Sequence, residues 1–339
     1  MKKFLKVIGI ILLIIVILGV IVTASAYFFV KSKLDKMQQV DINENDLNVS
    51  TQVEEQLSGY RNIALFGVDS RDSDLGIGNR SDCIIIASIN NDTKEIKLIS
   101  VYRDTYVDIE GYGLDKITHA YSYGGPELAL KTLNKNLDLN VKEFVTVNFD
   151  AVADAVDALG GVEIDVEENE IEYLNMYAGS IAKLRGIEYT NVTEPGMQTL
   201  NGLQAVGYSR IRYTAGGDYK RTERMRTVLE AMFKKLKGKS ISEITDMADK
   251  ILPEVYTNLD ANEIISLAPT ILTYEISESI GWPYDVKGIT TDRWYGVPVT
   301  LESNVKQLHE EAFGEKDYTP SETVQEISDS IVSETGYTN

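Results

Sequence analysis

The sequence has little cysteine, little histidine and too few basic residues to balance its acids. A single cysteine, Cys83, excludes an intramolecular disulfide and any multi-cysteine metal site. The two histidines, His119 and His309, show no metal-ligand spacing, and we interpret both as structural or surface residues. With 52 acidic against 33 basic residues, the net charge is -19. The chain therefore lacks the broad positive surface that nucleic-acid binding needs, and we expect no nucleic-acid partner.

One long stretch has no charge at all. Residues 7–30 read VIGIILLIIVILGVIVTASAYFFV, which is long enough to cross a membrane and longer than the apolar core of a cleavable signal. We expect a retained transmembrane anchor, although Ala24-Ser25-Ala26 resembles a cleavage site and leaves removal open. Lysines flank the run almost equally, so the positive-inside count hardly decides its orientation. The free amino terminus and the acids that soon follow favour residues 1–6 as a cytoplasmic tip, with the bulk of the chain outside.

The remaining chain divides by its pattern. Residues 31–58 are polar and acidic without a clear period, and we interpret them as an extracytoplasmic stalk. The tail, 314–339, is acidic and rich in Ser and Thr, and we expect it to be disordered. Between them, 59–313 is predicted to form the main folded domain, in which we interpret 168–200 as a surface excursion. We see no internal repeat.

Short apolar runs in this domain alternate with helical patterns. The runs 61–67, 82–89, 95–101 and 162–166 are bounded by turn residues, as expected for buried strands. Pro126 opens one helical pattern, and a second, from Phe149, stops at Gly160-Gly161. This alternation predicts an α/β fold with a mixed sheet covered by helices.

Arginine is concentrated in one place. The stretch 209–226, SRIRYTAGGDYKRTERMR, holds five arginines and one lysine against two acids. An apolar stripe from Met225 places Arg221 and Arg224 in the first turns of a helix, for which Asp218 is the expected N-cap. If Arg210 and Arg212 lie on a strand, they share a face. Helix N-termini and guanidinium groups both favour phosphate, so the stretch predicts an anion site, although a solvated charged face is the simpler reading.

Acids and arginines also recur at three strand ends, namely Asp69-Ser70-Arg71, Arg80-Ser81-Asp82 and Arg103-Asp104. Open α/β sheets place ligands at such ends. Two carboxylates near clustered arginines suit a pyrophosphate with Mg²⁺, because Mg²⁺ takes one or two carboxylates together with phosphate oxygens.

At these residues the chain resembles the LytR-CpsA-Psr family of bacterial cell-wall proteins. The resemblance runs from about Asn62 to Leu229 and rests on five ordered motifs: LFGVDSR (65–71), RSD (80–82), RDTYVDIEGYGLDKITHAYSYGGPELALKTL (103–133), VNFDAVADAVDALGGVEIDV (147–166) and LNGLQAVGYSRIR with GGDYKRTER (200–212 and 216–224).

The resemblance implies an enzyme that transfers a glycan phosphate from a polyprenyl-pyrophosphate carrier to a peptidoglycan hydroxyl. The donor would be teichoic acid, capsule or a similar wall polymer. A central sheet flanked by helices on both faces, preceded by one transmembrane helix, and an apolar channel for the lipid are implied as well. The family plan places the N-terminus in the cytoplasm and the domain outside the cell membrane.

The family's site roles transfer by motif. Asp69 and Asp82 resemble carboxylates that bind Mg²⁺, with Mn²⁺ as the alternative metal, and Asp82 and Arg103 are the expected catalytic pair. The expected pyrophosphate clamp consists of Arg71, Arg80, Arg103, Lys116, Arg210, Arg212, Arg221 and Arg224. Asp104 is expected to orient a neighbouring arginine. Lys116 either contacts phosphate or simply pairs with Asp115.

Four positions depart from the family pattern, namely Cys83, Tyr102, Thr118 and Met225. None removes a charged clamp residue, so they bear on donor specificity more than on the reaction. Cys83 lies in an apolar run and is expected to be a small core residue, not a nucleophile. Two alternatives stay open: a pyrophosphatase acting on the same lipid, and a non-catalytic lipid-binding or regulatory protein of the cell envelope.

Overall fold

The computed structural model describes residues 28, 30–70, 74–260, 264 and 273–338. The predicted cytoplasmic tip and nearly all of the predicted anchor lie outside these residues. None of the helices in the described part of the chain combines the length and apolar character that a membrane span requires.

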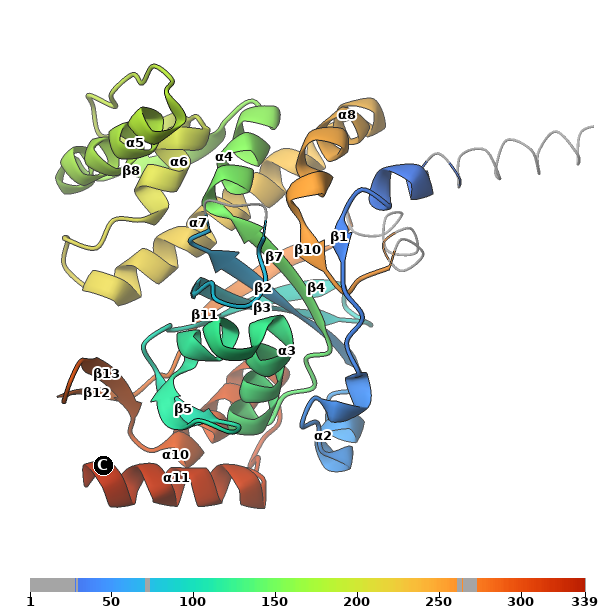
Figure 1. The fold of residues 1–339 in the computed structure, drawn as a ribbon, viewed down its shortest axis with the longest axis vertical. Helices are drawn as coiled ribbons and strands as arrows, with labels where there is room; N and C mark the ends of the chain where they lie inside the picture. Colours follow the sequence, from blue (N-terminus) through green and yellow to red (C-terminus); the bar gives the residue numbers. More distant parts are fainter. Residues whose placement is uncertain (1–27, 29, 71–73, 261–263, 265–272, 339) are drawn as a thin grey trace, which may run out of the picture.

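A seven-stranded mixed sheet forms the centre of the molecule, as the sequence predicts (Figure 1). Its strands, in spatial order, are β1 (Gln38–Gln39), β10 (Tyr256–Thr257), β7 (Glu143–Asn148), β2 (Tyr60–Val68), β3 (Ser81–Asn90), β4 (Glu95–Val101) and β11 (Glu275–Trp282). β2 runs parallel to β7 and antiparallel to β3, while β4 is antiparallel to β3 and parallel to β11.

Three two-stranded sheets surround the centre: β5 (Tyr106–Ile109) with β6 (Gly113–Lys116), β8 (Val162–Val166) with β9 (Gly196–Leu200), and β12 (Val286–Thr290) with β13 (Trp294–Pro298). The helices are α2 (Thr51–Gln56), α3 (Ile117–Leu137), α4 (Phe149–Ala158), α5 (Ile171–Arg185), α6 (Gly202–Ser209), α7 (Gly217–Lys237), α8 (Ile241–Ile251), α10 (Leu301–Leu308) and α11 (Glu322–Thr335). Short helical turns are η1 (Glu44–Asp46), η2 (Glu168–Glu170), η3 (Leu252–Glu254) and η4 (His309–Phe313).

Side-chain alternation along β3 explains why helices cover both faces of the sheet. Ile84 and Ile86 belong to one core cluster, which also contains the buried residues of α3, α10 and α11. Ile85 and Ile89 belong to another, against which Leu229 of α7 packs. Because successive strand residues point to opposite faces, a continuous apolar run such as CIIIASI needs an apolar cover on each side. The expected sheet with helices on both faces is confirmed.

Residues 31–58 are not a free stalk, so this prediction is wrong. β1 pairs with β10, and Leu47, Val53 and Leu57 are buried in the main core. Ser50 caps α2 by accepting a hydrogen bond from the amide of Val53. The i,i+4 pair Val53 and Leu57 gives the short helix an apolar side, which packs on the domain.

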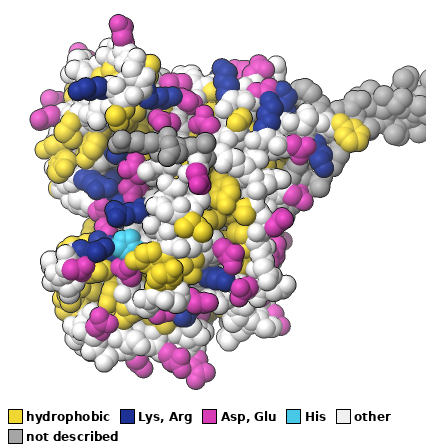
Figure 2. Space-filling view, viewed as in Figure 1, with side chains coloured by type: hydrophobic (Ala, Val, Ile, Leu, Met, Phe, Trp, Pro, Cys, Tyr) yellow, Lys and Arg dark blue, Asp and Glu magenta, His cyan; other side chains and the backbone are white. Residues whose placement is uncertain are grey.

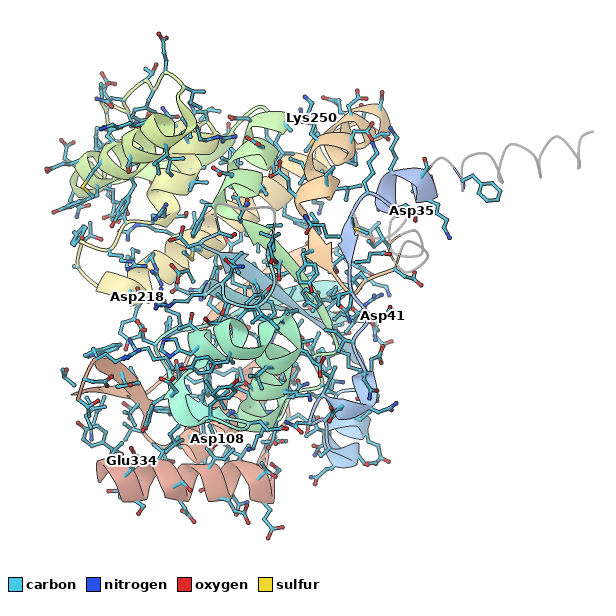
Figure 3. All side chains as sticks on the ribbon, viewed as in Figure 1. Asp35, Asp41, Asp108, Asp218, Lys250 and Glu334 are labelled. Carbon is cyan, nitrogen blue, oxygen red and sulfur yellow. The ribbon has the colours of Figure 1, made fainter. Side chains whose placement is uncertain are left out.

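The tail is not disordered either. Residues 322–335 form α11, capped by Ser321 and buried through Val324, Ile327 and Ile331, which have helical spacing. Glu334 lies on α11 (Figure 3) and accepts a hydrogen bond from the hydroxyl of Tyr106 in β5 at 2.8 Å. The domain therefore extends on both sides of the predicted limits 59–313.

The segment 168–200 is also structured, against the predicted surface excursion. It contains η2, α5 and β9, and Leu174, Ala178 and Ala182 of α5 are buried in a separate apolar cluster with α4 and α6. These elements form the upper part of the molecule in Figure 1.

Candidate active site

The three strand ends that carry acids and arginines meet at one edge of the sheet. β2 ends at Val68, which pairs with Ser81 at the start of β3, and β4 ends at Val101. Because β2 and β4 are both antiparallel to β3, their carboxyl ends lie beside its amino end. The predicted convergence is confirmed.

A polar cavity of about 570 Å³ lies at this edge. Seven of the predicted site residues line it, namely Asp69, Arg80, Asp82, Arg103, Arg210, Arg212 and Arg221. Arg71 lies outside the described residues. Figure 2 shows Lys and Arg side chains gathered at the left margin of the molecule, between the upper part with α5 and α6 and the lower part with α3 and β5.

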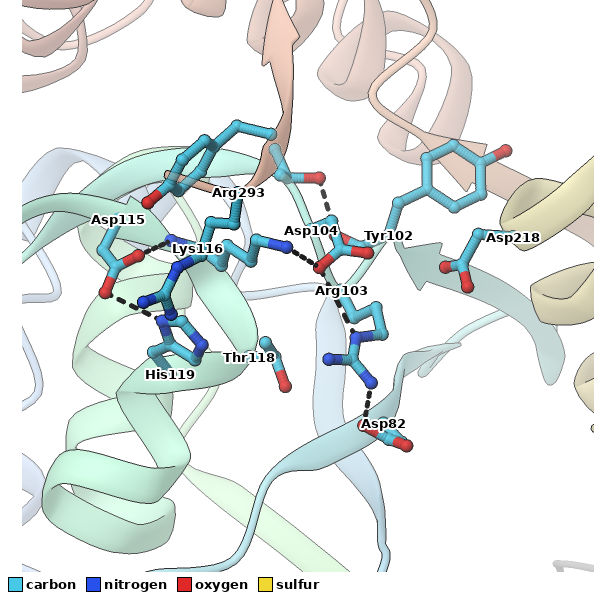
Figure 4. Close-up of polar contacts among 12 residues, drawn as sticks. Asp82, Tyr102, Arg103, Asp104, Asp115, Lys116, Thr118, His119, Asp218 and Arg293 are labelled. Atoms are coloured by element: carbon cyan, nitrogen blue, oxygen red, sulfur yellow. Dashed lines mark hydrogen bonds and ion pairs between the residues drawn. The ribbon is translucent and has the colours of Figure 1, made fainter. Parts of the chain in front are cut away.

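Arg103 lies at the centre of a chain of charged contacts (Figure 4). Its guanidinium donates to the Asp82 carboxylate, and its Nε lies 3.6 Å from Oδ1 of Asp104. The ammonium of Lys116 donates to that same Asp104 oxygen at 2.7 Å. Asp104 thus forms an ion pair with Arg103, the neighbouring arginine that it is expected to orient. Lys116 contacts Asp104, not Asp115, with its ammonium, and it does not line the polar cavity.

Arg210 and Arg212 do not lie on a strand. Arg210 is the C-terminal cap of α6, and the chain then turns without regular structure. Both side chains still reach the polar cavity. The Arg210 guanidinium lies over the rings of Phe149 and Tyr177, 5.0 and 5.7 Å from their centroids. Aromatic faces attract a cation and hold it without using its N–H donors, so these donors remain available to a ligand.

The glycine pair starts α7. Gly216 and Gly217 have φ of 88° and 51°, which side chains with a Cβ adopt only with strain. Gly216 is the N-terminal residue outside the helix, so Asp218 is not the cap that the sequence predicts. Asp218 instead accepts a hydrogen bond from Arg221 at 3.0 Å, and Figure 3 shows it at the start of α7.

Arg221 is buried, and not all of its guanidinium nitrogens have a hydrogen-bond partner in the described part of the chain. Its exposed fraction is 1%, and its Nη2 donates to Asp218 and weakly to the carbonyl oxygen of Asp82 at 3.4 Å. Its Nε and Nη1 are buried and make no hydrogen bond within the described part of the chain. Burial lowers the pKa of the Arg221 guanidinium, and Asp218 offsets part of this effect. Buried unpaired donors are costly and mark the place of an absent acceptor.

Arg224 does not belong to the clamp, which corrects the sequence prediction. Its side chain is 1% exposed and donates through Nε to Glu170 at 2.6 Å, where Glu170 is equally buried. Its two terminal nitrogens donate to the carbonyl oxygen of Ile211 and to the hydroxyl of Thr214. Arg224 therefore ties the turn after Arg210 to the helical part around η2. This contact could not be predicted from the sequence, because the partner lies in the segment interpreted as a surface excursion.

An apolar cavity of about 280 Å³ adjoins the polar one, and Phe149 and Met225 line both. Aliphatic side chains of β2, β3, β7, α4 and α7 form its wall, among them Leu65, Ile85, Val152, Ala155 and Val228. Cys83 also lines it, and burial raises the pKa of its thiol to about 12, so the group stays neutral and is no nucleophile. Met225 stands at the junction of the two cavities, where the sequence departs from the family pattern.

Some lining residues carried no signal in the sequence. Asn79 and Ser122 line the polar cavity as well, and both are ordinary polar residues of a turn and a helix. Tyr177, which lies under Arg210, is on the unpredicted helix α5. Thr118, a departure from the family pattern, donates through its hydroxyl to the carbonyl oxygen of Ser81 at 2.9 Å and fixes α3 to the start of β3.

The fold and the site together define a class: a mixed α/β protein with an arginine-rich anion cavity that opens into an apolar cavity. A sequence model of the LytR_cpsA_psr family matches residues 24–307. The chain belongs to the LytR-CpsA-Psr family, as its motifs predict.

Relatives and solved structures agree with this membership. The chain is 31% identical over 270 residues to the polyisoprenyl-teichoic acid–peptidoglycan teichoic acid transferase TagU of Enterococcus faecalis, a match that covers 79% of this chain and 82% of the relative. It is similar to the structure of TagT bound to LIIa-WTA, with 27% identity, a TM-score of 0.58, and coverage of 83% and 92%. It is also similar to TagT with bound octaprenyl pyrophosphate lipid, with 26% identity, a TM-score of 0.54, and coverage of 83% and 92%.

Proposed function

We propose that this protein transfers a glycan phosphate from a polyprenyl-pyrophosphate carrier to peptidoglycan, with teichoic acid as the foremost candidate for the glycan. The observation that carries the proposal is Arg221, a buried guanidinium with two unpaired nitrogens at a cavity that continues into an apolar one. A pyrophosphate attached to a lipid supplies anionic acceptors for the first cavity and methylene groups for the second. The names of the relatives, a teichoic acid transferase and a structure with a bound prenyl pyrophosphate, support the same donor.

In this proposal the arginines have two different roles. Arg221, Arg210 and Arg212 hold the phosphates, while Arg103 stabilises charge on the phosphoryl group that moves. The acceptor oxygen attacks the phosphorus next to the glycan, the bond to the bridging oxygen breaks, and polyprenyl phosphate leaves with the bonding electrons. Guanidinium groups fixed before the reaction stabilise the charge that develops in the transition state.

The residues present fit Mg²⁺. Asp69 and Asp82 line the same cavity, and two carboxylates together with phosphate oxygens and waters form a suitable set. Within the described residues, no group of three or more His, Cys, Asp and Glu side chains could hold a metal alone, so the substrate would have to complete the coordination. Asp69 and Asp82 would hold the ion, whose charge would stabilise the pyrophosphate oxygens. The cavity lining has five arginines against two aspartates, which favours an anion even before a metal binds.

We also infer that residues 7–30 anchor the protein in the cell membrane with the domain on the outside, next to its lipid-linked donor. The apolar composition of the run supports this inference. A pyrophosphatase and a lipid-binding protein remain the two alternatives, because each would use the same two cavities.

The test uses the full-length protein in detergent, a short-chain polyprenyl-pyrophosphate glycan and peptidoglycan fragments. We expect a glycan-phosphate–peptidoglycan product by mass spectrometry, lost with a chelator and reduced at least about 10²-fold in Arg103→Ala, as expected for one stabilising group. Release of prenyl phosphate without a joined product would favour the pyrophosphatase. Donor binding without turnover would favour the binding protein.

A further inference from the structure

The Asp115–His119 pair joins β6 to the first turn of α3, and neither residue lines the polar cavity of the donor site. Nδ1 of His119 lies 2.8 Å from Oδ2 of Asp115. The same oxygen accepts a hydrogen bond from the Tyr123 hydroxyl at 2.7 Å, and Oδ1 accepts one from the amide of Lys116, also at 2.7 Å. The carboxylate thus accepts hydrogen bonds from three donors around it.

These contacts fix the tautomer of His119. Burial raises the pKa of Asp115, but the hydrogen bonds from His119, Tyr123 and Lys116 more than offset it, and the pKa lies below its ordinary value. An ionised carboxylate only accepts hydrogen bonds, so Nδ1 of His119 carries the proton. Nε2 then presents a lone pair. It accepts no hydrogen bond within the described part of the chain, and the His119 residue is 6% exposed.

Two neighbours of His119 on α3 contact Arg103 or line the polar cavity. The amide of Thr118 donates to the carbonyl oxygen of Arg103 at 3.1 Å, so His119 follows directly on a residue that touches Arg103. Ser122, three residues after His119, lines the polar cavity. Residues three apart share one side of a helix. Figure 4 shows His119 beside Thr118, on the opposite side of Arg103 from Asp218.

Two exposed tyrosines extend this surface. The rings of Tyr112 and Tyr123 are stacked, with centroids 4.3 Å apart and planes 17° apart, and the Tyr123 ring lies 5.7 Å from that of His119. Tyr112 is 57% exposed and Tyr123 is 37% exposed. Stacked aromatic rings at the surface offer a flat apolar face with polar edges, which suits the C–H face of a sugar ring.

We propose that Tyr112, Tyr123 and the Asp115–His119 pair form the acceptor side of the active site, where the tyrosines bind a sugar of the peptidoglycan chain and His119 deprotonates its hydroxyl. This assignment rests on the proposed function. As the acceptor oxygen bonds to phosphorus, its proton moves to Nε2, and the electrons of the breaking bond leave with polyprenyl phosphate. The imidazolium that forms is stabilised by Asp115 and later loses its proton to water.

The charged and titratable groups described around the pair do not act as the base in place of His119. Tyr123 donates its hydroxyl proton to Asp115, and hydrogen bonding to Asp115 raises the pKa of Tyr123. From the β12–β13 turn, Arg293 and Tyr295 face Asp115, but Arg293 donates to its neighbour Asp292 at 2.9 Å. In this described set, His119 is thus the residue whose ring nitrogen Nε2 has a lone pair that is not used in a hydrogen bond.

The test compares wild type, His119→Gln and Asp115→Asn, all full length, in the peptidoglycan transfer assay from pH 5 to 9. We expect kcat for His119→Gln to fall about 10²- to 10⁴-fold, the usual contribution of a general base. The pH profile of the rate should differ between this variant and wild type, and added imidazole should restore part of the rate. Asp115→Asn should lose less, because Nε2 remains. Donor affinity, measured without acceptor, should stay within about threefold of wild type, which also shows that the variants are folded.

Variants of Tyr112 test the sugar-binding role of the tyrosines. Tyr112→Ala should raise KM for the peptidoglycan fragment about tenfold or more with little change in donor affinity, whereas Tyr112→Phe, which keeps the ring, should not.

The outcomes separate the two proposals. If wild type joins no glycan phosphate to the acceptor, the proposed function fails. If wild type transfers normally and His119→Gln keeps its rate and its pH profile, the assignment of His119 is overturned. An unchanged acceptor KM in Tyr112→Ala overturns the sugar-binding role of the tyrosines. A loss of donor affinity in His119→Gln together with its rate, without rescue by imidazole, would show a structural role only.

Discussion

Arg221 and Arg224 lie one helical turn apart and are equally buried, yet their contacts indicate different roles. Arg221 has unpaired donors at the cavity, whereas Arg224 neutralises Glu170. Arg221→Met should therefore lower donor affinity by about 2–5 kcal/mol, as for loss of one partner of a buried charge pair. Its stability should change by less than about 1 kcal/mol, because the unpaired donors are costly when no ligand is bound. Donor titration and urea unfolding measure the two effects.

Arg224→Met is the matched variant. It leaves the carboxylate of Glu170 buried without its partner, which typically costs about 3–5 kcal/mol of stability. The folded fraction should bind donor within a few-fold of wild type. The double variant Arg224→Met with Glu170→Leu should recover much of the loss, because the uncompensated charge is removed. Equal effects of the two single variants on donor affinity would contradict the division of roles.

At the residue scale, the sequence predicted which side chains meet but not how each is held. Asp69, Asp82 and Arg103 were placed correctly, because strand ends in a sheet are fixed by a strong apolar pattern. Arg210 and Arg212 reach the cavity from the end of a helix and the turn after it, not from a strand. Arg224 was misassigned because helical phase alone cannot show which buried arginine has an acidic partner far away in the sequence.

At the scale of elements, α4 and α7 form a wall of the apolar cavity. A larger side chain in this wall tests whether the cavity binds the lipid. Ala155 of α4 lines the cavity, so Ala155→Trp should place an indole where prenyl units are proposed to bind. We expect affinity for a long-chain prenyl pyrophosphate to fall at least about tenfold, whereas a donor with one or two prenyl units should bind as before. The short donor is the internal control in an equilibrium binding assay. Equal loss for both donors would place the lipid elsewhere or indicate a damaged polar cavity.

The elements that the sequence missed share a physical cause. α2, α5 and α11 are rich in polar residues, and each buries only a narrow stripe, such as Leu174, Ala178 and Ala182 of α5. Ser50 and Ser321 cap α2 and α11, but a capped polar segment becomes a stable helix only when a neighbour covers its apolar side. That neighbour is a tertiary feature. The strands β2, β3, β4 and β8 and the helix α4, with dense apolar runs, were predicted well, whereas β1, β7, β10 and β11 were not predicted.

At the scale of the whole molecule, the C-terminal residues close the core beneath α3. The carboxylate of Asp138, at the end of α3, accepts hydrogen bonds from the hydroxyls of Ser321 and Tyr318 and from the Ser321 amide. His309 stacks on Tyr318 with ring centroids 3.7 Å apart and donates through Nε2 to the carbonyl oxygen of Leu137 at 3.1 Å. The predicted disordered tail is thus part of the main core.

This closure makes stability depend on pH through His309. Its Nδ1 is buried without a partner, and burial lowers its pKa below the value in an unfolded chain. The unfolded state therefore binds the proton more readily, so stability is complete above the unfolded pKa of about 6.5 and falls as pH decreases below it, by at most about 1.4 kcal/mol per pH unit. Urea unfolding at pH 7.5 and 5.5 should show this loss in wild type. His309→Asn should be less stable at pH 7.5 but should lose less stability on acidification, because it lacks the imidazole. The carboxylates that also titrate are common to both proteins, so they do not account for the difference. An identical loss in the two proteins would mean that His309 is not the group whose protonation opens the C-terminal part of the core.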